Sequence, residues 1–290
     1  RPSEEELAER KRVQDSIALV QAQEMEAKLI SEQITAQLQT EKNATTPSEQ
    51  LAEQLAAVYG PFAPATEGKE GLITIENSKV RIGIAYRGGR IAKAELKEYQ
   101  AYGDSINPLC LFQGEESSLN FTLVTNTNRI LATQNLYFAE ANQTTDAQGN
   151  TTLTMRLNTN IEDCYLDFVY TLPADDYMVS MSIQPHNMQL ALAQNMSSIE
   201  MQWNQSIPQQ EKGRKFEERY AQLQYMFVGS DIEKLSEAKA DRKQESARIK
   251  WIGYKDQFFS TVMIANDGFE STEMESTPAG AHTRYIKEYK

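Results

Sequence analysis

A strict alternation of apolar and polar residues between residues 71 and 99 constrains the fold more than any other feature of the chain. From Val80 to Tyr86 every second side chain is large and apolar, the period of a β-strand with one buried and one solvated face. Asn77-Ser78 precedes this segment, and Gly88-Gly89 follows it, where glycines can take the positive φ angles that tight hairpin turns need. Alternation resumes from Ala92 to Leu96. The stretch predicts three antiparallel strands joined by short turns.

Strand patterns with turn residues between them continue through most of the chain, as is typical of a sandwich or barrel. The turn at Pro173–Asp176 is expected to join two neighbouring antiparallel strands, and Trp251 is expected in the core. Met188, Leu190 and Leu192 also predict a strand. Further strands are expected at 120–124, 136–140, 153–157, 164–172, 177–183, 199–203, 220–228, 248–254 and 258–265. The charged segments 208–219 and 234–246 predict loops or short helices, whereas 284–290 fits a strand or a helix.

Helices are expected before the first strand. A capping box at Ser3 and Glu6 opens a segment without Pro or Gly that continues to residue 41. Its apolar stripe is thin, so both a stalk or coiled-coil seam and a solvated, partly frayed helix remain open. A second capping box at Thr46–Glu49 predicts a short helix to about Tyr59, followed by a partly extended linker to residue 69.

Composition excludes several classes of partner. The formal net charge of −12 argues against nucleic acid and anionic membrane surfaces, since both need a basic face. No run reaches the roughly 18 consecutive apolar residues of a spanning helix. The chain starts at Arg1 rather than at a methionine, and it stops at Lys290 in the middle of a sequence pattern that fits a strand or a helix. We therefore expect a soluble piece of a longer protein.

Two stretches carry a resemblance to a known family. Residues 70–111, with the Gly-Gly turn, Leu96–Tyr99 and Pro108–Phe112, resemble the start of the large periplasmic domain of the YidC membrane-protein insertases. Trp251–Ser260 resembles the W-x-(small)-x-K-x-Q-(F/Y)-F strand pair of that domain. The resemblance covers about residues 70–268. It implies a mainly β fold, namely a two-sheet antiparallel β-supersandwich of the galactose mutarotase-like type. The N-terminal helical segments expected above precede this fold and depart from the best-known family members.

The resemblance also implies a domain order and a role. We expect a charged amphipathic helix at 1–42 after a missing transmembrane helix, a short helix and linker at 43–69, the β-supersandwich at 70–268, and an acidic tail at 269–290 leading to the membrane region. The family places this domain at the bacterial inner membrane, facing the periplasm. It implies a non-catalytic aid to membrane-protein insertion through contacts with the Sec translocon, its accessory subunits and nascent membrane proteins, with no cofactor.

Candidate chemistry is sparse. The chain has two histidines, His186 in a Pro-containing loop and His282, and it lacks C-x-x-C, H-E-x-x-H, G-x-S-x-G and nucleotide-binding glycine motifs. The acidic pairs Glu115-Glu116 and Asp175-Asp176, like Asp146, lie in predicted turns, where solvated acids are common. We therefore expect no catalytic, cofactor-binding or metal-binding residues.

An alternative function is carbohydrate binding or mutarotase-like sugar processing, because related folds hold sugar sites. Two aromatic pairs are candidates for a sugar-stacking groove, although aromatics on amphipathic strands are more often core: Tyr99 with Tyr102, and Trp203 with Tyr220. Sugar processing needs a positioned histidine acid and a carboxylate base, and histidines are few. Cys110 and Cys164 fit two buried thiols or a disulfide, and their spacing does not decide between them.

Overall fold

The structure is a computed structural model that describes residues 49–104, 106–194 and 198–290. The predicted helix at 1–42, the helix start at Ser3 and the capping box before residue 49 lie outside these residues. The short helix is confirmed as α2, Glu49–Tyr59. The expected linker after it is instead a 3-10 helix, η1, Gly60–Thr66, because Phe62 is fully buried in the core and fixes this segment against the sheets.

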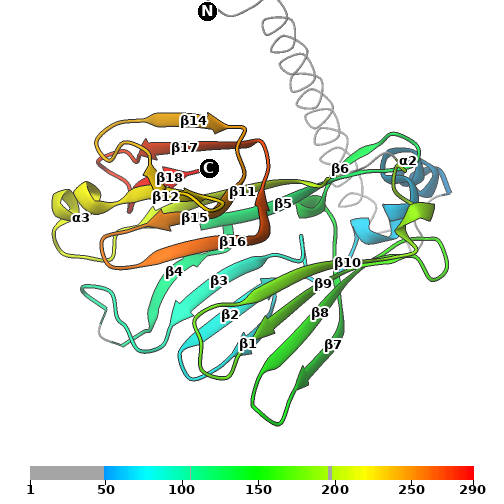
Figure 1. Cartoon of the computed structure of the whole chain (residues 1–290). Coiled ribbons are helices and arrows are strands. Elements are labelled where there is room, and N and C mark those ends of the chain that lie inside the picture. Colours follow the sequence, from blue (N-terminus) through cyan, green and yellow to red (C-terminus); the bar gives the residue numbers. More distant parts are fainter. Residues whose placement is uncertain (1–48, 105, 195–197) are drawn as a thin grey trace, which may run out of the picture.

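The mainly β, antiparallel fold is confirmed, and its ladders fall into four sheets (Figure 1). The first contains β1 (Leu72–Glu76), β2 (Val80–Ala85), β3 (Ile91–Leu96) and β4 (Leu109–Gln113). The second contains β10 (Ser180–His186), β9 (Tyr165–Leu172), β8 (Thr151–Asn158) and β7 (Ala139–Thr145). The third has the order β14 (Asp241–Glu245), β17 (Thr272–Pro278), β18 (Tyr285–Tyr289), β11 (Glu200–Pro208), β5 (Ser117–Val124) and β6 (Ile130–Ala132). The fourth contains β13 (Ile232–Lys234), β12 (Gln222–Phe227), β15 (Ile249–Lys255) and β16 (Ser260–Phe269). Short helices η2 (Gly114–Glu116), η3 (Thr133–Asn135), η4 (Met188–Leu190) and α3 (Arg214–Tyr220) connect them.

The predicted opening meander is present, with β1 pairing β2 and β2 pairing β3. The two strands flanking Pro173–Asp176 are neighbours, as expected, since β9 pairs β10 in an antiparallel register. Local alternation specifies these hairpins, because a shift of one residue would expose every apolar side chain of a strand.

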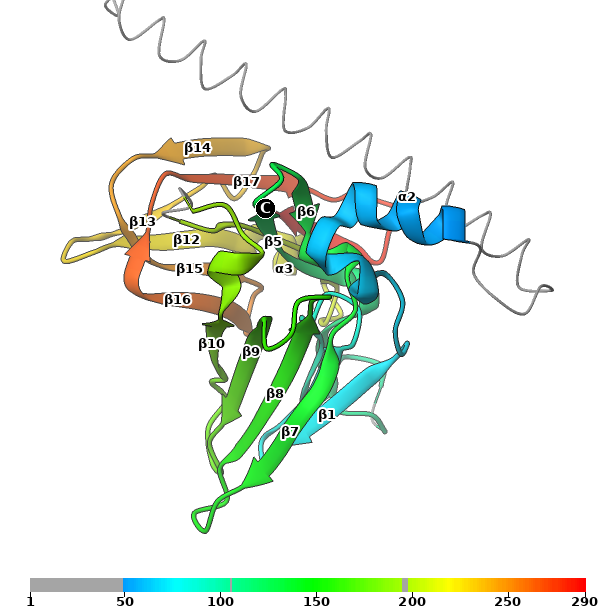
Figure 2. The same ribbon diagram turned by 90° about the vertical axis from the view of Figure 1, so that its right-hand side faces the viewer.

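Two hydrophobic cores lie between the sheets. The larger is built mainly from the first two sheets together with β5, and it includes Phe138, Phe168 and Tyr170. The smaller lies between the third and fourth sheets and includes Trp203 and Tyr254. Leu119 on β5 packs against both cores, so the six-stranded sheet joins the two halves seen in Figure 2.

The predicted strand at Met188–Leu192 and the predicted core position of Trp251 are wrong. Asn187 takes a left-handed conformation with φ of 50° and ends β10, so Met188–Leu190 forms η4 instead of a strand. Trp251 is only half-buried, because it lies on the outer face of its sheet opposite Met226 and Ile264. Trp203 occupies the core in its place.

The prediction of a loop or short helix at 234–246 is wrong, because this segment contributes to β13 and forms β14, which pairs with β17. The open question at 284–290 resolves to β18, which pairs with β17 and β11. Residues 269–290 thus place two strands in the six-stranded sheet, with Ile286 and Tyr289 buried.

Candidate functional site

A cleft of about 660 Å³ lies where the first sheet meets the end of β11. Backbone and amide hydrogen bonds shape it: the Tyr102 amide donates to the Gln210 carbonyl at 2.7 Å, and Gln210 Nε2 donates to the Cys110 carbonyl at 2.8 Å. The lining residues are Lys93, Glu95, Ala101, Tyr102, Asp104, Asn107, Pro108, Cys110, Gln113, Pro208, Gln209, Gln210, Glu211 and Arg284. These contacts join segments about a hundred residues apart into one wall.

The charges that line this cleft are mostly paired. Lys93 Nζ lies 2.8 Å from the Glu95 carboxylate, and Arg284 lies 2.6 Å from Glu116 just behind the lining. Burial raises the pKa of the Cys110 thiol, which keeps it protonated and a poor nucleophile. Amides, paired charges and one tyrosine suit hydrogen bonding to a neutral polar ligand or a polypeptide backbone.

The four aromatic candidates do not form one groove. Tyr102 lines the cleft, with Lys212 Nζ 5.8 Å from its ring centroid. Tyr99 packs edge-on against Phe259. The second pair does not form a groove either, because Trp203 stacks within the core and Tyr220 lies exposed on α3.

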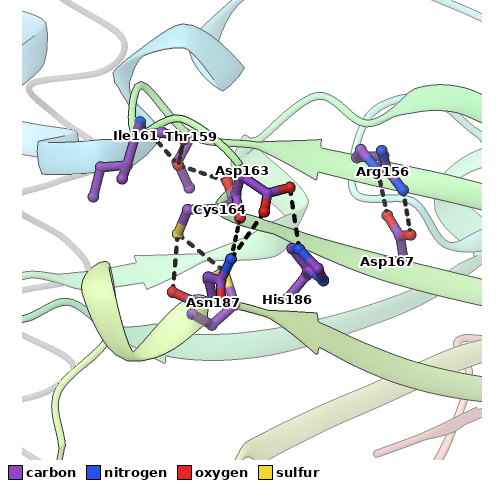
Figure 3. A network of polar contacts seen from close by, with 9 residues as sticks. Arg156, Thr159, Ile161, Asp163, Cys164, Asp167, His186 and Asn187 are labelled. Carbon is purple, nitrogen blue, oxygen red and sulfur yellow. Dashed lines mark hydrogen bonds and ion pairs between the residues drawn. The ribbon is translucent and has the colours of Figure 1, made fainter.

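His186 meets an acid at the end of β10 (Figure 3). Its Nε2 lies 3.1 Å from Asp163 Oδ1, and its ring stacks on Tyr165 with centroids 4.5 Å apart. The expected loop is a strand here, and Pro185 is tolerated because β10 is an edge strand. Both members of the pair are solvent-accessible and contact each other directly, so they form a surface polar contact at the open end of the β9–β10 hairpin.

The neighbouring polar contacts in Figure 3 are structural. Arg156 donates to both carboxylate oxygens of Asp167, at 2.8 and 2.7 Å, and lies 3.5 Å from the Tyr165 ring centroid. Asn187 Nδ2 donates to the Asp163 carbonyl at 2.8 Å. Arg156, Tyr165 and His186 thus form a stacked column that ties β8, β9 and β10 together.

The cysteines and the second histidine are not brought together. Cys110 and Cys164 are free, and the Cys164 thiol is buried against the Asn187 carbonyl and Met188. His282 lies exposed in the turn before β18.

The acidic candidates act in ion pairs between segments. Glu116 is buried and pairs with Arg284, while Asp175 pairs with Lys79 at 3.2 Å. Asp146 accepts hydrogen bonds from the amides of its own turn, and those bonds lower its pKa. Across the described parts of the chain no group of three or more His, Cys, Asp or Glu side chains is arranged to hold a metal ion.

The sequence could not have located the cleft. Its lining comes from β3, β4, the loop between them, the end of β11 and Arg284, and no local motif marks these residues. The fold and the site define a class: an antiparallel β-sandwich domain with a polar cleft.

Comparison with known proteins identifies the family. A family model described as the YidC periplasmic domain matches residues 72–290. A protein of Parabacteroides distasonis, named membrane protein insertase YidC, is 45% identical over 279 residues, which is 95% of this chain and 42% of that protein. Proteins of the same name from Azobacteroides pseudotrichonymphae and Bacteroides fragilis are 43% identical over 238 residues and 39% identical over 289 residues, covering 81% and 100% of this chain. The chain belongs to the YidC periplasmic-domain family.

The match extends through β17 and β18 to the end of the chain. The chain spans 42%, 37% and 43% of the lengths of these three relatives. Within the residues that the structure describes, no helix has the length and apolar character needed to cross a membrane.

Proposed function

We propose that the chain is the periplasmic part of an inner-membrane insertase and works as a non-catalytic scaffold for membrane-protein insertion. The family match over residues 72–290, with relatives that carry the insertase name, is the observation that carries this proposal. Insertion itself would be performed by membrane-spanning parts of the parent protein. Residues 1–42, for which the sequence predicts a helix, and the segment 43–69 would connect the β domain to one such part, and the chain after Lys290 would lead to another.

We further propose that the cleft is the docking face for the Sec translocon, its accessory subunits or nascent membrane proteins. Its lining offers amides, a tyrosine and paired charges, groups that bind a polypeptide segment without demanding a strong charge on the partner. A sugar-processing role has less support. Neither histidine lines the cleft, and the His186–Asp163 pair is already in direct contact.

The test is binding of purified Sec accessory subunits in detergent to the immobilised chain. Tyr102→Ala removes the aromatic contact of the cleft, whereas Tyr220→Ala removes an exposed tyrosine outside it. We expect the first variant to weaken binding by about tenfold, or about 1.4 kcal/mol, and the second to leave it unchanged. Equal binding by both variants and the unmodified chain would remove the cleft from the proposal. No enrichment over an unrelated acidic β domain would count against docking altogether.

A further inference from the structure

Two acidic side chains are buried together behind one wall of the cleft. Glu217, on α3, is fully buried, and Asp256, at the turn between β15 and β16, is 5% exposed. The Asp256 amide donates to the Phe259 carbonyl at 2.8 Å, which closes the turn and fixes the position of Asp256. Gln210, whose amide donates to Glu217 at 2.7 Å, borders the same small cavity as Asp256, so the two carboxyl groups lie on neighbouring segments.

The pair has no counter-cation among the residues the structure describes. Glu217 accepts hydrogen bonds from the amides of Gln210 and Glu211, at 2.7 and 3.2 Å. Both carboxyl oxygens of Asp256 are buried and make no hydrogen bond of normal geometry, although the neighbouring Gln257 amide faces the carboxyl and partly offsets the rise of its pKa. Two ionised carboxylates in this place would be strongly unfavourable, and a proton between them supplies the missing donor.

The other titratable groups facing the pair do not replace this proton. Glu211 adds a further negative charge. The hydroxyls of Tyr289 and Tyr254 donate to the carbonyls of Lys255 and Trp203, so their protons are already committed. The Lys255 amine contacts the Tyr220 carbonyl on the other side of the turn.

The space for water beside Asp256 is small. The cavity bordering Asp256 has a volume of about 10 Å³, room for at most a single water molecule. Burial, reinforced by the charge of Glu217, raises the pKa of Asp256 to about 8, and burial also raises the pKa of Glu217. A single water molecule would solvate an ionised Asp256 far less than bulk water does.

We propose that Glu217 and Asp256 share one proton, and that this proton fastens α3 and the 209–211 segment to the β15–β16 turn. Glu217 holds the amides of Gln210 and Glu211, and both residues line the cleft. The Tyr102 amide in turn donates to the Gln210 carbonyl. Loss of the shared proton therefore loosens the cleft wall, which makes the cleft sensitive to the pH of the surrounding solution. The inference stands on the buried pair and is independent of which partner docks.

The direct test is a carbon-detected NMR titration of the side-chain carboxyl groups in the unmodified chain. Asp256 is expected to titrate with a midpoint near 8, with a coupled response at Glu217. The hydrogen-exchange protection of the Gln210 and Glu211 amides should fall through the same midpoint. Ordinary midpoints below about 5 for both carboxyls would overturn the proposal.

Denaturant unfolding from pH 4 to 9 gives a second readout. The folded pKa of Asp256 is raised from 3.8, so its stabilisation is complete below about pH 4 and is lost as pH rises to 8. Between pH 4 and 8, the ratio of the unfolding constant of the unmodified chain to that of Asp256→Asn should rise by up to about tenfold per pH unit. Above about pH 8 this ratio should level off. Glu200→Gln, at an exposed position, should behave like the unmodified chain. Parallel curves for Asp256→Asn and the unmodified chain would contradict the shared proton, and if that variant does not fold, the titration alone decides.

Discussion

Replacement of Gly89 by alanine tests the packing of the turn from which the fold was predicted. Gly89 has a φ of 62°, in the left-handed region, where an alanine costs about 1 kcal/mol. A Cβ atom there would also lie 2.9 to 3.0 Å from three ring atoms of Phe138, which is buried against Phe168. Because this ring cannot move freely, overpacking adds about 1 to 3 kcal/mol. We expect Gly89→Ala to lower the free energy of unfolding by about 2 to 4 kcal/mol.

Gly103 provides a matched control. Its φ of 85° is also left-handed, but a Cβ atom there would have no neighbour within 4 Å. Gly103→Ala should therefore cost only the backbone strain, about 1 kcal/mol. Urea denaturation followed by tryptophan fluorescence measures both variants, and the difference between them isolates the contact with Phe138. Equal losses in the two variants would refute the packing argument for the turn.

Three further predictions concern groups that the structure places in the core or in hairpins. Arg156→Ala should lower the free energy of unfolding by about 2 kcal/mol, because it leaves the buried Asp167 carboxylate without its bidentate partner. Urea denaturation measures this loss, and a loss below about 0.5 kcal/mol would contradict the prediction. Tyr170→Phe should cost about 1 to 2 kcal/mol in the same assay by leaving a turn carbonyl unpaired, whereas no loss would show that this bond does not join the two sheets. Unfolding without reductant should expose two free thiols, Cys110 and Cys164, to alkylation, and mass spectrometry showing fewer than two modifications would indicate a disulfide.

Local alternation predicted the strands well where one face is buried and the other is solvated. The segment Val80–Tyr86 and the pair of strands around Pro173–Asp176 follow this rule. The same rule failed at Met188–Leu192, where the left-handed Asn187 ends the strand before the alternation can continue. It also failed to place Trp251, because both faces of β15 carry apolar side chains and the pattern does not say which face is inside.

The cleft and the buried acids depend on contacts that no local pattern encodes. Gln210 reaches Cys110 across 100 positions of sequence. Asp256 lies in a hairpin turn, where an acid is ordinarily solvated, and residues of β4 and β11, far away in the sequence, lie beside it. The charged sequence of β14 likewise shows no alternation that predicts a strand, and this segment is a strand because it pairs with β17.

Site-specific photocrosslinking in the membrane-anchored parent protein tests docking through the cleft most directly. A photoreactive residue in place of Gln209, on the cleft wall, should form adducts with Sec subunits or nascent membrane proteins during active synthesis. The same residue in place of Glu200, exposed outside the cleft lining, should form few. Adducts at Gln209 that match those at Glu200 in amount and identity, or none at either position, would contradict docking through the cleft.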